Sequence, residues 1–107
     1  MRLEIRSEGQ EPGPPPGAIE RKLRLTLGRF HSRVRRVSVH LTDLDGHGGA
    51  LRARCHIAVR LAPAGRVCVT ITEVDLATAL DRAAARIGSA VGRKLLEGPI
   101  QDGLGRA

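Results

Sequence analysis

Two stretches of the chain alternate apolar and polar residues with a period of two, the pattern of a β-strand with one buried face. In "RARCHIAVRL" at 52–61, the apolar side chains fall on one side and Arg54 and Arg60 fall on the other. The stretch "VRRVSVHL" at 34–41 repeats this pattern, with Arg36 on its polar side. Two such strands predict a sheet that has one face in the core and an arginine-bearing face outside it.

The composition limits the chain to a single domain with an anionic partner. Its 107 residues, 41% of them hydrophobic, are enough for one modest core. Eighteen Lys plus Arg against eleven Asp plus Glu give a formal net charge of +7, which favours nucleic acid as the partner. The chain has no Trp, no Tyr and one Phe, so its strands lack the exposed rings on which bases stack. Phosphate contact and shape recognition of folded or double-stranded RNA or DNA remain.

The other elements follow from changes of period and from turn residues. Four prolines at 9–17 exclude a helix interior and predict a loop. The predicted elements in chain order are a strand at 2–6, a helix at 16–32, strands at 34–42, 51–61 and 66–72, and a helix that begins near Asp75. Thr72 or Asp75 is the candidate cap of that last helix. In the first helix, Leu25 points away from the apolar face.

This order predicts an α+β fold, β-α-β-β-β-α, with a four-stranded mixed sheet and two helices on one face. A strand-helix-strand unit in one sheet is normally parallel and right-handed, so the first two strands lie side by side. The turns "TDLDGHGGA" and "APAG" add the other two as hairpins. We expect a domain at 1–97 and a flexible tail at 98–107, because a Gly-Pro pair ends the helical pattern. The open sheet face would display Arg2, Arg6, Arg36, His40, Arg54, His56, Arg60 and Arg66.

The two cysteines are predicted to be free thiols. Cys55 and Cys68 would lie on opposite faces of the last hairpin, which excludes a bridge between them and favours a reducing compartment. The start "MRLEIRSEG" lacks an apolar signal region, and no run has the length of a membrane span. We therefore expect a soluble, cytoplasmic protein with no membrane partner.

Basic side chains also gather on the helical segments. Arg82, Arg86 and Arg93 stand four and seven residues apart, which places them in one exposed stripe of the last helix. Only two acids, Asp75 and Asp81, occur between residues 74 and 96, so we expect few neutralising partners and an RNA-binding role. The other candidate RNA-binding residues are Arg21, Lys22, Arg29, Arg33, Arg36, Arg54, Arg60 and Lys94.

No metal, cofactor or catalytic centre is predicted. His40 and His56 are neighbours on the outer face, but no third ligand accompanies them. Cys55 and His56 point to opposite faces of a strand and do not form a nucleophile-base pair. The loop at 45–49, "DGHGG", joins two strands and opens no helix, so it is a flexible hairpin loop rather than a phosphate cradle. No small-molecule substrate and no enzymatic activity are expected.

Three segments resemble the ribosome hibernation factors, also called ribosome hibernation promoting factors or ribosome-associated inhibitors. They are the opening "MRLEIR", the run "LGRFHSRVRRVSVHL" and the last helix start "DLATALDRAAARI", and the likeness spans residues 1 to about 97. The family's last helix typically begins with an aspartate, an aliphatic residue, a tyrosine, an alanine, an aliphatic residue and an aspartate. That pattern falls on Asp75, Leu76, Ala77, Ala79, Leu80 and Asp81, with Ala77 in place of the tyrosine.

The resemblance implies a fold similar to double-stranded-RNA-binding domains and an activity that is not enzymatic. Such proteins bind the small ribosomal subunit in the channel where messenger and transfer RNA would sit, and so silence translation in idle ribosomes. This chain looks like a short member, without the C-terminal dimerisation domain of longer ones.

The sequence departs from the family pattern at several positions. Thr26 and Ser89 stand where the family commonly has basic residues, whereas Arg86, Arg93 and Lys94 match basic positions. Prolines at 14–16 replace the usual first turn of the first helix.

The function predicted from these observations is translational silencing by binding to the small ribosomal subunit and its ribosomal RNA. The alternative is a general RNA-binding module that acts on structured RNA away from ribosomes. We expect a monomer, because a high net positive charge disfavours self-association.

Overall fold

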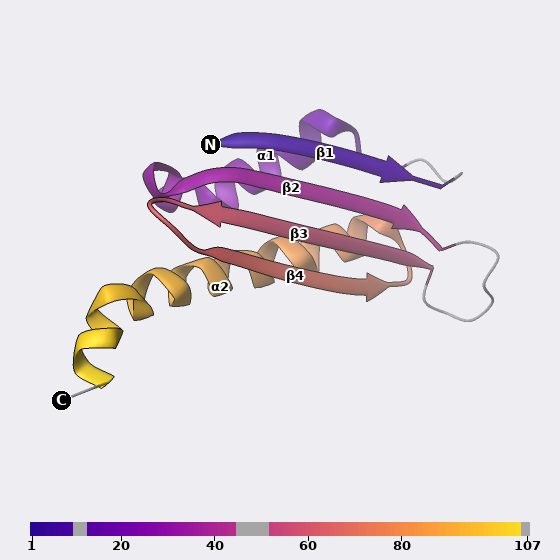
Figure 1. Ribbon diagram of the computed structural model, residues 1–107. Coiled ribbons are helices and arrows are strands. Elements are labelled where there is room, and N and C mark those ends of the chain that lie inside the picture. Colours follow the sequence, from indigo (N-terminus) through magenta and orange to yellow (C-terminus); the bar gives the residue numbers. More distant parts are fainter. Residues whose placement is uncertain (10–12, 45–51, 106–107) are drawn as a thin grey trace.

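The computed structural model describes residues 1–9, 13–44 and 52–105, with the backbone alone for 97–105. Four strands form one sheet in the order β1-β2-β3-β4, and Figure 1 shows both α-helices on the same side of it. The elements are β1 (Arg2–Glu8), α1 (Pro16–Leu27), the 3₁₀ helix η1 (Gly28–Arg33), β2 (Val34–Asp43), β3 (Ala53–Leu61), β4 (Arg66–Glu73) and α2 (Leu76–Gly105). The predicted α+β fold and its mixed sheet are confirmed.

The strand pairing follows the predicted topology. β1 is parallel to β2, whereas β3 is antiparallel to both β2 and β4. The β3–β4 turn is closed by a hydrogen bond from the amide of Leu61 to the carbonyl of Gly65, which has a φ of +117°. β1 is two residues longer than predicted and ends at Glu8. Predicted loop residues 10–12 and the predicted hairpin loop at 45–49 lie outside the described residues.

The apolar side of the alternating strands forms the core with the helices. Along β2 and β3 the buried residues are Val34, Val37, Val39, Leu41, Ala53, Cys55, Ile57, Val59 and Leu61. Ile19 and Leu23 of α1 and Ile87 and Val91 of α2 cover them and are fully buried. Each such aliphatic side chain contributes about 1.5–3 kcal/mol of transfer free energy. Burial of one face leaves the other face of the sheet uncovered.

The first helix is divided into two parts. α1 begins at Pro16, a position where a missing amide proton costs nothing, and Pro15 precedes it in extended conformation. It ends at Leu27, and the next six residues form η1. The predicted continuous helix to about Ser32 is therefore wrong in its last part, because the tighter 3₁₀ turns that commonly end helices share nearly the same apolar spacing. Leu25 is 78% exposed, as its departure from the apolar pattern predicted.

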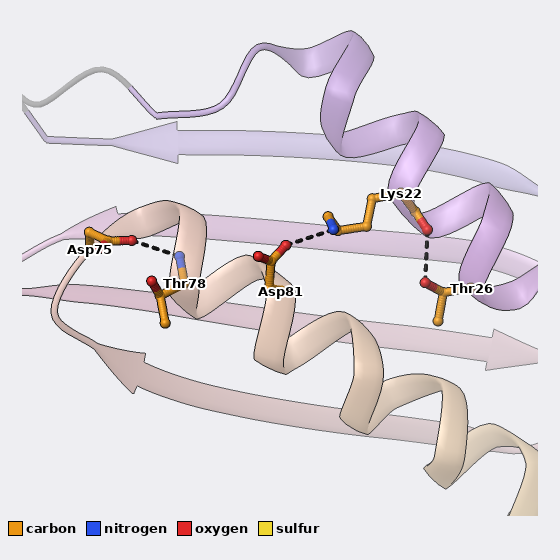
Figure 2. A network of polar contacts seen from close by, with 5 residues as sticks. All are labelled: Lys22, Thr26, Asp75, Thr78 and Asp81. Atoms are coloured by element: carbon orange, nitrogen blue, oxygen red, sulfur yellow. Dashed lines mark hydrogen bonds and ion pairs between the residues drawn. The ribbon is translucent and has the colours of Figure 1, made fainter.

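Asp75 caps the start of α2. Its carboxylate accepts a hydrogen bond from the amide of Thr78 at 2.7 Å, as Figure 2 shows. This backbone contact lowers the pKa of Asp75 below its ordinary value of 3.8. Of the two predicted cap residues, the structure therefore selects Asp75.

α2 continues to Gly105 and projects beyond the sheet in Figure 1. The predicted end of the helix at the Gly-Pro pair, residues 98–99, is wrong for the backbone. A proline inside a helix removes one hydrogen bond and favours a kink, which need not end the helix. Flexibility of residues 98–107 in solution stays a prediction.

Two glycines allow α1 and η1 to lie close to α2. A Cβ on Gly88 would stand 2.8 Å from Cγ2 of Thr26, and one on Gly92 would stand 3.2 Å from the ring of Phe30. Beside this contact, Lys22 and Asp81 form an ion pair of 2.6 Å between the helices (Figure 2). Within the described segments, no helix is long and apolar enough to cross a membrane.

Candidate nucleic-acid interface

The strand register brings four arginines together on the open face of the sheet. Arg2 pairs with Arg36 across β1 and β2, Arg36 pairs with Arg60 across β2 and β3, and Arg60 pairs with Arg66 across β3 and β4. All four side chains are exposed. We call Arg2, Arg36, Arg60 and Arg66 the arginine row. Each strand of the sheet contributes one guanidinium to it.

One member of the arginine row has an acidic partner. Arg36 lies 2.5 Å from a carboxylate oxygen of Glu4, and the hydrogen bond between them lowers the pKa of Glu4 and raises that of Arg36. Within the described part of the chain, no carboxylate pairs with Arg2, Arg60 or Arg66. Like charges directly opposite one another on neighbouring strands repel. The row therefore carries a net positive charge that Glu4 compensates only in part.

Two hollows adjoin the arginine row and share Arg60 and Arg66. The first lies on the open face, where Arg36, Arg60 and Arg66 surround the small side chains of Ser38 and Ala58. The second curves around the β3–β4 turn, where Arg35 joins the two shared arginines. Guanidinium groups around small side chains leave room for a bulky anion such as phosphate.

The opposite end of the open face is more mixed in charge. His40 lies 3.2 Å from Glu8, and Nδ1 of His56 is 2.7 Å from the hydroxyl of Thr70. These four residues line a shallow hollow with Thr42 and Arg54. Among the described residues, the carboxylates of this face, Glu4 and Glu8, both belong to β1. On β3 and β4 the charged side chains of this face are arginines.

The predicted stripe on α2 is partly neutralised. Few neutralising partners were predicted for these arginines, but Arg82 forms an ion pair with Glu73 at the end of β4. Glu73 was not predicted as a partner, because it precedes the helix in sequence and the fold brings its carboxylate to Arg82. Arg86 and Arg93 are exposed and have no acidic partner in the described ranges.

The basic residues of α1 and η1 point to several sides. Lys22 is held by Asp81, and Nε of Arg33 donates to the carbonyl of Ala62 at 2.9 Å. Arg29 lies over the ring of Phe30 at 4.9 Å from its centre, and Arg21 is exposed. The predicted candidates on this segment therefore do not form one patch.

The predicted RNA-binding residues thus lie on the open face of the sheet, on the helical side, and at the end of the sheet near the β3–β4 turn. Arg36 and Arg60 lie in the arginine row, and Arg54 lies farther along the same face. Lys94 of α2 lies beside Gly65 at the β3–β4 turn, near the end of the sheet that carries the row. Arg35 was missed as a candidate. It lies beside Arg60 and Arg66 at an irregularity of register between Val34 and Arg36.

The cysteine placement agrees with the prediction. Cys55 is buried in the core and Cys68 is exposed on the open face. Burial raises the pKa of the Cys55 thiol to about 12, so this sulfur stays protonated at neutral pH. Over the described ranges, no group of three His, Cys, Asp or Glu residues could hold a metal ion.

The chain is a small α+β domain with a four-stranded mixed sheet, two helices on one face and a basic open face. Two solved structures are similar to it. A crystal structure of the Thermus thermophilus Protein Y N-terminal domain matches with a TM-score of 0.63 and 28% identity, over 87% of this chain and 98% of that one. A ribosomal subunit interface protein from Coxiella burnetii matches with a TM-score of 0.65 and 12% identity, over 90% and 99% of the two chains. No family model matches the sequence, and no curated protein matches it significantly.

The predicted resemblance to the ribosome hibernation factors is confirmed by these comparisons. The Protein Y match carries it, because it combines shared topology with 28% identity over 87% of the chain. The Coxiella match supports the fold alone.

Proposed function

We propose that this chain binds the small ribosomal subunit in the channel where messenger and transfer RNA would sit, and so silences translation in idle ribosomes. The observation that carries the proposal is the match to the Protein Y N-terminal domain over 87% of the chain. The family that the sequence motifs resemble has this activity.

The charge distribution supports an RNA partner for this domain. The net charge of +7 includes exposed arginines on both faces of the molecule, among them Arg86 and Arg93 on α2. Contacts of such side chains with phosphates release counterions and give affinity without base reading.

The positions of the Cys55 thiol and the His56 imidazole favour a binding role over catalysis. The Cys55 thiol is buried and protonated, and His56 lies on the opposite face of β3. A nucleophile needs a base within hydrogen-bond reach, which this arrangement does not provide for Cys55.

The first experiment is co-sedimentation of the purified protein with small ribosomal subunits in sucrose gradients. We expect binding that weakens steeply as salt rises, with a log-log slope of several units. Absence of the protein from the subunit fraction at low salt would overturn the proposal.

The second experiment tests α2 with the double variant Arg86→Glu and Arg93→Glu. We expect affinity for the subunit to fall at least about tenfold, with a salt slope lower by about one to two units. Arg82 is left unchanged, because a glutamate there would repel Glu73 and disturb the fold. The single variant Arg86→Glu is compared with a matched control, Arg24→Glu on α1, because Arg24 is already paired with Glu20 at 2.8 Å. Equal losses in these two single variants would contradict a specific role for α2.

The alternative function is that of a general module for structured RNA. It is distinguished by competition, in which a free RNA hairpin is titrated against small subunits. A hairpin that displaces the protein at concentrations similar to those of subunits would favour the general module.

A further inference from the structure

Figure 1 shows both helices on one side of the sheet. The arginine row lies on the other face, because its residues alternate along the strands with the buried core residues. Arg86 and Arg93, which belong to the proposed ribosome contact, lie on α2 on the other side. The molecule measures 17 Å along its shortest principal axis, so its two basic faces are separated by one thin domain. A partner that contacts the helices leaves the row free for a second contact.

We propose that the arginine row is a second RNA-binding surface, which holds the phosphate backbone of an RNA strand crossing the open sheet face while the helices contact a separate RNA segment. This inference rests on the proposed function, because it assumes that RNA is the partner. It adds the group that is bound, the residues that bind it, and a bridging role for the domain.

The charge balance of the row is the first support. Three pairs of arginines are direct neighbours across the four strands, and a single described carboxylate, that of Glu4, forms an ion pair with a member of the row. Such an arrangement is repulsive in the free protein. A polyanion that lies along the row removes this repulsion, so charge complementarity selects RNA over a neutral partner.

The geometry of the row is the second support. Neighbouring strands are about 4.8 Å apart, so the four arginines extend over about 14 Å in a line perpendicular to the strands. A planar guanidinium donates two parallel hydrogen bonds to a phosphate, which suits it to repeated contacts along a backbone. Ser38 and Ala58 beside the row keep the hollow open, and the Ser38 hydroxyl adds a donor.

The side chains of the open face favour phosphate contact over base stacking. Among Phe, Trp and Tyr the chain has a single residue, Phe30, and it packs on the helical side against Gly92. The imidazoles of the open face, His40 and His56, lie at the end away from the row, where they contact Glu8 and Thr70. Stacking platforms for single-stranded bases need exposed rings. The row would therefore follow the backbone of RNA without reading its sequence.

Cys68 provides a natural probe of this surface. It is exposed on the open face, pairs with Ala58 across β3 and β4, and lies two residues from Arg66. RNA bound along the row should shield its thiol from iodoacetamide. Buried Cys55 serves as the internal control that stays unmodified.

The experiment measures the rate of Cys68 alkylation by intact mass, with and without an RNA hairpin of about 16 base pairs. We expect the hairpin to slow alkylation several-fold. The double variant Arg60→Glu with Arg66→Glu should lose this protection, and its RNA affinity should fall at least about tenfold with a salt slope lower by about one to two units. The variant Arg86→Glu with Arg93→Glu should keep the protection, although it changes the net charge equally.

A second probe reports on the helical face. Ser89→Cys in a Cys68→Ser background places a thiol on α2 between Arg86 and Arg93. RNA should protect this thiol, and the protection should persist when Arg60 and Arg66 are changed to Glu. A bound hairpin stoichiometry of two per protein in native mass spectrometry would support simultaneous contact with both faces.

The outcomes separate this inference from the proposed function. Unchanged Cys68 alkylation, together with full RNA affinity of the Arg60→Glu and Arg66→Glu variant, would overturn the inference and leave an acidic protein surface as the occupant of the row. Normal co-sedimentation with small subunits in that case would leave the proposed function intact. Protection of Cys68 by the hairpin without any subunit binding would support the row and overturn the ribosomal proposal.

Discussion

At the scale of single residues, the Asp75 cap of α2 contributes more to the stability of the fold than the nearby ion pair of Lys22 and Asp81. Asp75 satisfies a backbone amide that has no partner inside the helix, whereas Lys22 and Asp81 are 40% and 60% exposed and their pair is screened by water. We expect Asp75→Ala to lower the Tm by about 4 to 8 °C and Asp81→Ala to lower it much less. Thermal unfolding followed by circular dichroism checks both, and equal losses would contradict this ranking.

The contribution of Asp75 should also depend on pH. Its pKa in the folded protein lies below the ordinary 3.8, so its stabilising effect is present above that value and is lost as the pH falls through the folded pKa. The Tm difference between the wild type and Asp75→Ala should therefore be full at pH 6 and shrink toward zero in strong acid. A difference that stays constant down to the lowest pH would show that the carboxylate charge is not involved.

The two thiols should differ sharply in reactivity. Cys55 is buried, with a pKa raised to about 12, whereas Cys68 is exposed. We expect a thiol reagent to modify one cysteine in the native protein and both after denaturation. Mass spectrometry of digested fragments identifies the modified residue. Rapid native labelling of Cys55 would mean that the core around β3 opens readily.

At the scale of elements, the contact between the helices depends on the absence of a side chain at Gly88. A methyl group there would clash with Thr26, since its carbon would lie 2.8 Å from Cγ2. We expect Gly88→Ala to destabilise the protein by about 1 to 3 kcal/mol, despite the higher helix propensity of alanine. Urea unfolding measures the effect.

A double-mutant cycle tests the cause of that loss. In a Thr26→Ala background, Gly88→Ala should become neutral or stabilising, with a coupling energy of about 1 kcal/mol or more. Gly17→Ala on α1 is the matched control, because a Cβ there meets nothing within 4 Å and should stabilise the helix slightly. An unchanged cost of Gly88→Ala without Thr26 would assign the loss to another contact.

At the scale of the whole molecule, the net charge of +7 should keep the protein monomeric. Light scattering at low micromolar concentration should give the mass of one chain, near 11.5 kDa. The exposed large apolar residues of the described segments are Leu25, Val74 and Leu96, which are 78%, 50% and 77% accessible, and a dimer would form through such residues. A dimeric mass would contradict the prediction, and its loss on changing Leu96 to Ser would locate the interface.

Local sequence patterns determined the fold to a large extent. Alternation with a period of two located the strands, helical spacing located the two helices, and the turn at 62–65 predicted a hairpin, because each of these signals is carried by neighbouring residues. The buried and exposed positions of Cys55 and Cys68 followed from the same alternation. The short 3₁₀ segment and the continuation of α2 past residues 98–99 did not follow, because 3₁₀ and α-helical spacing differ little and a proline weakens a helix without always ending it.

The tertiary structure alone decided which charges meet. The arginine row exists because strand pairing aligns Arg2, Arg36, Arg60 and Arg66, which are separated by up to 64 positions in the chain, into one line. The pairing of Arg82 with Glu73 and the contact of Gly88 with Thr26 likewise join residues of different elements. Alternation predicts which face a side chain takes, but register is set by backbone hydrogen bonds and core packing between distant segments. The sequence therefore determined that this sheet would carry arginines, and the fold decided that four of them would stand side by side.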